Sequence, residues 1–248
     1  MAPIPYQQLT SPMATIEVGT GEDKVVFQVH KDTLTSNSPF FNNALNGGFM
    51  EARLGLVPLP DDDPDIVYRM INWLYTHEVD DRNDVREPMA GSTPKDDSGS
   101  FSENDEENDS RGSRSEEEED AQPAAASASA GPNALFKLWI MADKFMMPEL
   151  MEAVTQQLLA FLRTQQLYAL LGTESPVNCD PVPSVDTLQY VYDNTMESAS
   201  LRDLAILIAV MTWKMGSWSE EYRKDMLETL TPEVWQALLM ASLDAGRR

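Results

Sequence analysis

The sequence predicts an α+β fold, with a small sheet near its N-terminus and helices over most of the remaining chain. Two short runs rich in β-branched residues, TIEVGT and KVVFQVH, lie close together before residue 31. Beyond them, apolar residues recur at a spacing of about 3.6, the period of a helix with one buried face. Apolar side chains make up 42% of the 248 residues, which is enough to build a folded core.

The two β-rich runs predict a hairpin that turns at residues 19–23. Alternate side chains of a strand point to opposite faces of the sheet. Val26 and Gln28 are therefore expected on one face, and Val25, Phe27 and Val29 on the other.

Two short helices are expected after Lys31, where the apolar spacing changes from the strand period to the helical one. Ser38 and Pro39 suit the N-cap and the first position of the second helix. The apolar positions of this stretch are Leu34, Phe40, Phe41, Ala44 and Leu45.

The stretch RLGLVPLP predicts a brief third strand. Leu54, Leu56 and Val57 are expected to point inward. Pro58 restricts the strand to an edge or an end of the sheet, because proline has no backbone N–H to donate.

The run DDDPD is compatible with a metal site or with the start of a helix. Asp63 followed by Pro64 is typical of a helix start, since it combines an N-cap oxygen, a proline and negative charge at the positive end of the helix dipole. A calcium loop needs alternating ligands, a glycine and a distant glutamate, which are missing here. We expect no metal, and a helix that ends near His77 with one face made of Val67, Met70, Ile71 and Leu74.

Residues 80–132 are expected to form a disordered acidic insert. They contain 16 acidic and 5 basic residues, a net charge of −11 within the total of −23. So few apolar side chains cannot offset the entropy lost on ordering. Four serines each stand three positions before an acidic residue, a spacing that suits acidophilic kinases. A solvated spacer and a phosphorylated, regulated segment both fit this composition; the serines are Ser100, Ser102, Ser113 and Ser115.

Helical periodicity returns after the insert and predicts helices over residues 133–163 and 184–246. The first range is expected to hold two helices, the second beginning at Pro148, and Pro232 is expected to begin the last helix of the second range. The expected buried faces are, in chain order, Leu135, Leu138, Trp139, Ala142 and Phe145; Leu150, Val154, Leu158 and Phe161; Leu188, Val191 and Tyr192; Leu204, Leu207, Ile208, Met211 and Met215; and Val234, Trp235, Leu238 and Leu239.

Charge and composition exclude several classes of function. Nucleic-acid binding requires clustered Lys and Arg, and this acidic chain has no basic stripe, since its adjacent basic residues are the pairs Arg223–Lys224 and Arg247–Arg248. The single cysteine, Cys179, permits no intrachain disulfide, and the N-terminus lacks the pattern of a signal peptide. With no run of eighteen apolar residues, we expect no membrane span and a cytoplasmic or nuclear location rather than secretion.

Motifs of enzyme chemistry are also missing. The chain contains no GxxxxGK[ST], GxGxxG or GxSxG motif. His30, His77 and Cys179 are scattered, so no zinc ligands stand at motif spacing. We expect no catalytic site, cofactor or metal.

The order of the elements resembles the BTB (POZ) domain, and most closely the short stand-alone BTB proteins of fungi. The resemblance rests on VHKDTLTSNSPFF, the downstream GGFME, the strand ending LPDDDP before the helix with NWLYT, and LFKLWIMADKFMMPEL. It implies a three-stranded sheet packed against about five helices. Residues 14–79 and 133–163 would form the domain around the insert, with a disordered N-terminus at residues 1–13 and a helical extension at 184–246.

The resemblance also implies a non-enzymatic role in protein interaction, with His30 as a structural residue. Many family members are substrate adaptors for cullin-three ubiquitin ligases and carry a hydrophobic residue, any residue and a glutamate after the second short helix. Phe49, Met50 and Glu51 match that pattern and become candidate partner-binding residues, although Phe49 could instead close the core.

Two features leave the function and the oligomeric state open. The chain shows no propeller or MATH domain, and MAPIPYQQLTSP does not predict the strand and helix that many members exchange in a dimer. The sequence remains compatible with a monomer and with self-association through a smaller interface. A scaffold or transcription-associated factor with a phosphorylatable insert is the alternative to the adaptor.

Overall fold

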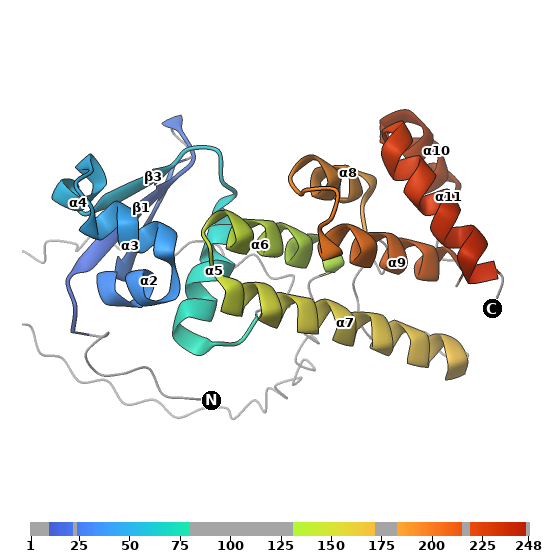
Figure 1. Cartoon of the computed structure of the whole chain (residues 1–248), viewed down its shortest axis with the longest axis horizontal. Helices are drawn as coiled ribbons and strands as arrows, with labels where there is room; N and C mark the ends of the chain where they lie inside the picture. The colour runs from blue at the N-terminus through green and yellow to red at the C-terminus, as the bar shows by residue number, and fades with distance from the viewer. Residues whose placement is uncertain (1–9, 22–23, 80–130, 172–182, 215–218, 247–248) are drawn as a thin grey trace, which may run out of the picture.

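A three-stranded sheet lies at one end of the molecule. The computed structural model describes residues 10–21, 24–79, 131–171, 183–214 and 219–246 (Figure 1). Strands β1 (Met13–Val18), β2 (Val25–His30) and β3 (Leu56–Leu59) are arranged in the order β2-β1-β3. β1 is antiparallel to β2 and parallel to β3, which confirms the predicted hairpin and the edge position of the strand that contains Pro58.

One face of the sheet packs against the helices and the other is open. Ala14, Ile16 and Val18 of β1 are buried together with Val57 and Leu59 of β3. In β2, Val26 and Gln28 are exposed while Val29 is buried, as the alternation predicts.

The parallel pairing of β1 with β3 requires a crossover, which three short helices provide. The first two are α2 (Lys31–Asn37) and α3 (Pro39–Asn46). Ser38 caps α3, because its Oγ accepts a hydrogen bond from the backbone N–H of Phe41 at 3.1 Å. Both the cap and Pro39 at the first helical position confirm the sequence prediction.

The third helix, α4 (Met50–Leu54), corrects the predicted start of the third strand. Leu54 is the last residue of α4 and is 67% exposed, so the expectation that it points inward is wrong. Leu56 is only half-buried, and Val57 and Leu59 fill the core instead. The reason is Gly55, whose left-handed conformation (φ 65°) ends the helix and shifts the strand register.

Helix α5 (Pro64–Thr76) begins as the sequence predicts. Asp63 Oδ1 accepts a hydrogen bond from the N–H of Asp65 at 3.0 Å, and Pro64 is the first helical residue. The helix ends at His77, which adopts the left-handed conformation at φ 54°. Val67, Met70 and Leu74 are buried on its inner face.

Two helices that follow the insert complete the core. They are α6 (Pro132–Lys144), which packs on α5, and α7 (Pro148–Leu171), which packs on α6. The predicted face of α6 is buried in full, and Phe145 just beyond it lies 5.0 Å from the ring centroids of both Phe40 and Phe41. Helix α7 continues to Leu171, well past residue 163.

Four further helices form the opposite end of the molecule (Figure 1). They are α8 (Val185–Asp193), α9 (Ser200–Lys214), α10 (Glu220–Thr229) and α11 (Pro232–Gly246). Helix α8 packs on α6, and α9 packs on α8 and α11, so the buried core continues from the sheet into this extension. None of the helices in the described ranges has the length and apolar character needed to cross a bilayer.

The buried faces of α9 and α11 differ in part from the predicted ones. In α9, Leu201, Ala205 and Ile208 are buried, whereas Leu207 is exposed. In α11, Leu239 is exposed beside the buried Leu238. Both helices carry apolar residues around most of their circumference, so their sequences do not define one inner face. Met215 lies outside the described residues.

Candidate functional site

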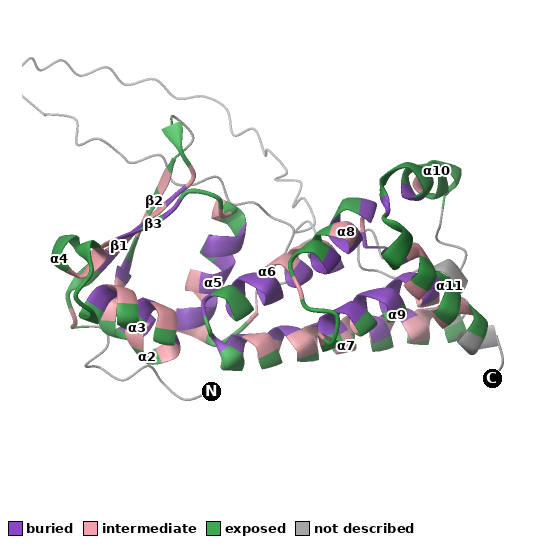
Figure 2. Cartoon of the chain, turned by 45° about the horizontal axis from the view of Figure 1, so that its top comes forward, coloured by how far each residue is buried: buried purple, intermediate pink, exposed green. Residues whose placement is uncertain are grey.

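The segment between α3 and β3 carries the three residues predicted to bind a partner. Phe49 is the N-cap of α4, and Met50 and Glu51 are its first two residues. Phe49 and Met50 are each 63% exposed, and Glu51 is half-exposed. No residue of α4 is buried (Figure 2). Phe49 therefore does not close the core, which removes that alternative.

The exposed side chains form one apolar surface. Met50 and Leu54 are four positions apart and so lie on the same side of α4, directly after Phe49. We call Phe49, Met50, Glu51 and Leu54 the α4 surface. Single exposed apolar residues are common, but three exposed apolar side chains on one short helix and its N-cap mark a candidate protein-interaction site.

Two glycines hold α4 in place. Gly47 ends α3 with its N–H donating to Asn43 O at 3.0 Å, and a Cβ at this position would stand 2.3 Å from that oxygen and 3.1 Å from the Phe49 ring. At the other end, the Gly55 N–H donates to Glu51 O at 2.8 Å, and Gly55 O accepts from the N–H of Thr15 in β1 at 2.8 Å. These contacts fix the direction in which Phe49 leaves the domain.

His30 lies apart from this surface and has a structural role. It ends β2, and its backbone N–H donates to the Tyr75 hydroxyl at 3.0 Å, while its Nδ1 lies 2.9 Å from the same oxygen. Because the hydroxyl accepts one of these bonds, its own proton is free to point at Nδ1. The pair ties the strand-to-helix junction to α5.

Two aspartates of the DDDPD run, Asp62 and Asp63, form ion pairs within the chain. Lys144 Nζ binds both carboxylate oxygens of Asp62, at 2.8 and 2.7 Å, and Lys137 pairs with Asp63 at 3.6 Å. Across the described residues, no group of three or more His, Cys, Asp or Glu side chains is arranged to hold a metal ion. Ser100, Ser102, Ser113, Ser115 and Cys179 lie outside the described part of the chain.

A three-stranded sheet with crossover helices and an exposed apolar α4 defines a protein-interaction module. Residues 13–91 match the family model of the BTB/POZ domain, so the chain carries a domain of that family. The Kelch-like ECH-associated protein 1A of Danio rerio is 36% identical over 61 residues. That alignment covers 24% of this chain and 10% of the relative, so the chain spans about a tenth of the length of the curated relative it matches.

Proposed function

We propose that this protein is a non-enzymatic adaptor whose α4 surface binds the scaffold of a cullin-three type ubiquitin ligase. The observation that carries the proposal is the exposure of Phe49 and Met50 on a helix fixed at both ends by Gly47 and Gly55. A short preorganised helix loses little conformational entropy when it docks. The match of residues 13–91 to a BTB/POZ domain supports the same function.

The chemistry of the α4 surface suits a small binding hot spot. Burying one phenylalanine side chain contributes about 1.5–3 kcal/mol, so Phe49 is the expected anchor in a partner's groove. Glu51 stands at the edge of that contact, where a carboxylate favours a basic or N–H-rich rim on the partner. Leu54 extends the apolar area by one turn of the helix.

A binding measurement with the purified N-terminal region of cullin-three tests the proposal. Phe49→Ala combined with Glu51→Ala should weaken binding by about 100-fold, the loss typical of an interface anchor. Leu227→Ala with Glu228→Ala is the matched control, because it removes an exposed leucine and an exposed glutamate from α10. The adaptor mechanism is wrong if wild type binds no better than the Phe49 and Glu51 variant.

The alternative function is a scaffold or transcription-associated factor that uses the acidic insert as a regulated segment. It is supported by Ser100, Ser102, Ser113 and Ser115, each three residues before a carboxylate. Phosphorylation would add further negative charge to a segment that already carries −11. Replacing residues 80–132 with a Gly-Ser linker should then change the recovered partners without lowering the melting temperature. Loss of folding in this variant would instead show that the segment is part of the domain.

A further inference from the structure

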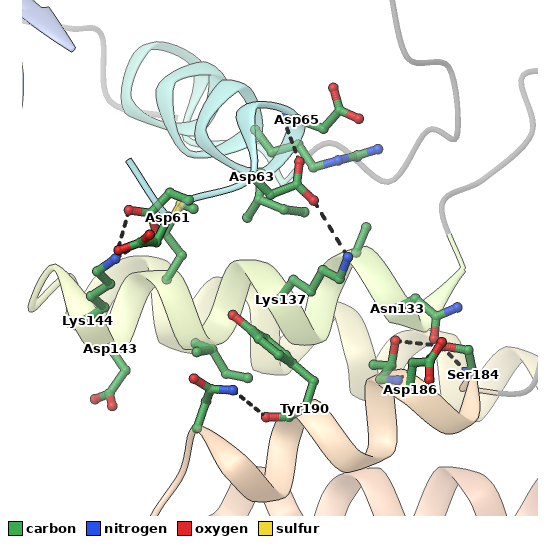
Figure 3. Close-up of a pocket in the computed structure, with 18 of the residues that line it drawn as sticks. Asp61, Asp63, Asp65, Asn133, Lys137, Asp143, Lys144, Ser184, Asp186 and Tyr190 are labelled. Atoms are coloured by element: carbon green, nitrogen blue, oxygen red, sulfur yellow. Dashed lines mark hydrogen bonds and ion pairs between the residues drawn. The ribbon is translucent and has the colours of Figure 1, made fainter. Parts of the chain in front are cut away.

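A charged cleft lies between the N-terminal end of α5, the length of α6 and the length of α8 (Figure 3). Its volume is about 1030 Å³. It belongs to different elements from the α4 surface, which lies at the far end of the molecule beside the sheet (Figure 1). We call it the acidic cleft.

The ionised side chains of the acidic cleft are predominantly negative. Its lining has six aspartates against three cationic side chains, Arg69, Lys137 and Lys144, a net charge of −3. The two lysines are already paired with Asp62 and Asp63. The four remaining aspartates form no ion pair with any residue that the structure describes; they are Asp61, Asp65, Asp143 and Asp186.

The lining of the acidic cleft is partly apolar. Ile66 of α5 and Ile140 and Met141 of α6 contribute buried side chains to the lining. The ring of Tyr190 rises from α8 toward α6 across the cleft (Figure 3). Burial raises the pKa of the Tyr190 phenol. The nearby carboxylates of Asp62 and Asp63 raise the pKa further, because their negative charges disfavour the ionised phenolate.

We propose that the acidic cleft binds an extended, Lys- and Arg-rich segment of a partner protein. Long basic side chains lay their methylene stems on apolar surface and keep their charged ends in polar surroundings. The apolar part of the lining and the carboxylates that form no ion pair offer both environments at once. Carboxylates spread from the start of α5 to the start of α8 suit an extended segment better than a single cation, and they would also speed its association.

This inference goes beyond the adaptor function and does not depend on it. A protein with partner sites on α4 and on the acidic cleft can hold two proteins at the same time, because the two sites share no element. Loss of binding at one site would leave the other unchanged, so the two proposals can fail separately.

The test uses the full chain and a fluorescein-labelled peptide of alternating lysine and alanine. The cleft variant combines Asp61→Asn, Asp65→Asn and Asp186→Asn, all of which are exposed. Each lost pairing has the modest strength of a surface ion pair, so anisotropy should show roughly tenfold weaker binding. A peptide of alternating glutamate and alanine should not bind to either form.

The matched control combines Glu149→Gln, Glu197→Gln and Glu220→Gln. Like the cleft set, it removes two carboxylates from the first turn of a helix and one from a loop, so the net charge changes equally. The control should bind the peptide as wild type does. Equal affinity for all three proteins, or an equal loss in both variants, would overturn the proposal.

Carbodiimide coupling then locates the bound peptide, because it joins a lysine amine to a carboxylate in contact with it. Coupling in wild type is expected at Asp61, Asp65, Asp143 or Asp186, as read by mass spectrometry of the digest. The insert is also acidic, with 16 carboxylates in residues 80–132. Coupling confined to the insert would mean that the cleft is not the binding site.

Discussion

Ser38 and Phe145 are 107 residues apart in the chain and share a buried hydrogen bond. The Ser38 Oγ donates to the Phe145 carbonyl oxygen at 2.6 Å and accepts from the Phe41 N–H at 3.1 Å. One hydroxyl thus caps α3 and joins it to the end of α6, on the far side of the acidic insert. The two parts of the fold on either side of the insert are held as one core.

Ser38→Ala should lower the free energy of unfolding by about 2–3 kcal/mol. It removes a helix cap and leaves the buried Phe145 carbonyl without a partner. Urea denaturation followed by circular dichroism measures the change. Ser36→Ala is the control, because Ser36 is exposed and its hydroxyl donates to the Asp32 carbonyl within α2, and it should cost under about 0.5 kcal/mol. Equal effects of the two substitutions would contradict the role of Ser38.

Gly47→Ala should distort the α4 surface, whereas Gly48→Ala should not. A Cβ on Gly47 would stand 2.3 Å from Asn43 O and 3.1 Å from the Phe49 ring, but one on Gly48 would meet nothing within 4 Å. We expect Gly47→Ala to cost about 1–3 kcal/mol through overpacking. Thermal melts and binding to the cullin-three N-terminal region would both show the difference. A Gly48→Ala variant as damaged as Gly47→Ala would rule out steric crowding as the cause.

Arg202→Met should destabilise the helical extension by about 2–4 kcal/mol. The buried guanidinium of Arg202 donates to the carbonyl oxygens of Tyr192 and Thr195, and it lies 4.6 Å from the Tyr192 ring centroid. Methionine fills similar space but leaves both carbonyls unpaired. Chemical denaturation monitored by hydrogen exchange of α8 and α9 would report the loss.

The exposed partner of Arg202 provides the comparison. Arg202 Nη1 binds Glu233 Oε1 at 2.7 Å, but the Glu233 side chain is 60% exposed. Glu233→Gln should therefore change the free energy of unfolding by less than about 1 kcal/mol. A larger effect from Glu233→Gln than from Arg202→Met would mean that the ion pair, rather than the buried carbonyl contacts, stabilises the extension.

Tyr190 should make stability depend on pH at the alkaline end. Burial, with smaller contributions from Asp62 and Asp63, raises its pKa above the ordinary value of 10.0. Because the folded-state pKa is the higher one, stability is present in full below about pH 10 and falls as the pH rises toward the folded-state pKa. Absorbance titration of the folded protein should show a phenol that ionises late.

Substitutions can assign that late ionisation. Tyr190→Phe should remove it, while Tyr192→Phe should leave it, although burial also raises the pKa of Tyr192. Asp62→Asn should bring the pKa of Tyr190 closer to 10.0, because it removes a nearby negative charge. An unchanged titration in Tyr190→Phe would assign the late phenol to another residue.

Local signals were sufficient to predict most of the elements from the sequence. The Ser38 and Asp63 caps, each followed by a proline, marked helix starts correctly because an N-cap interacts with residues only two or three positions away. Strand alternation placed Val26 and Gln28 on the open face for the same reason. The motif at Phe49, Met50 and Glu51 was also found from the sequence, and its partner-binding role stays a prediction.

Only the tertiary structure decided which apolar residues are buried when local pattern does not distinguish them. Leu54 and Leu207 are as apolar as their buried neighbours, and their exposure depends on Gly55 ending α4 and on the side of α9 that faces α8 and α11. The exposure of Phe49 and the assembly of the acidic cleft from residues 61–65, 143 and 186 likewise depend on elements far apart in the chain. The sequence by itself determined the elements and the class of domain, since those follow from neighbouring residues. The surfaces available to partners follow from packing between distant segments, which no local pattern specifies.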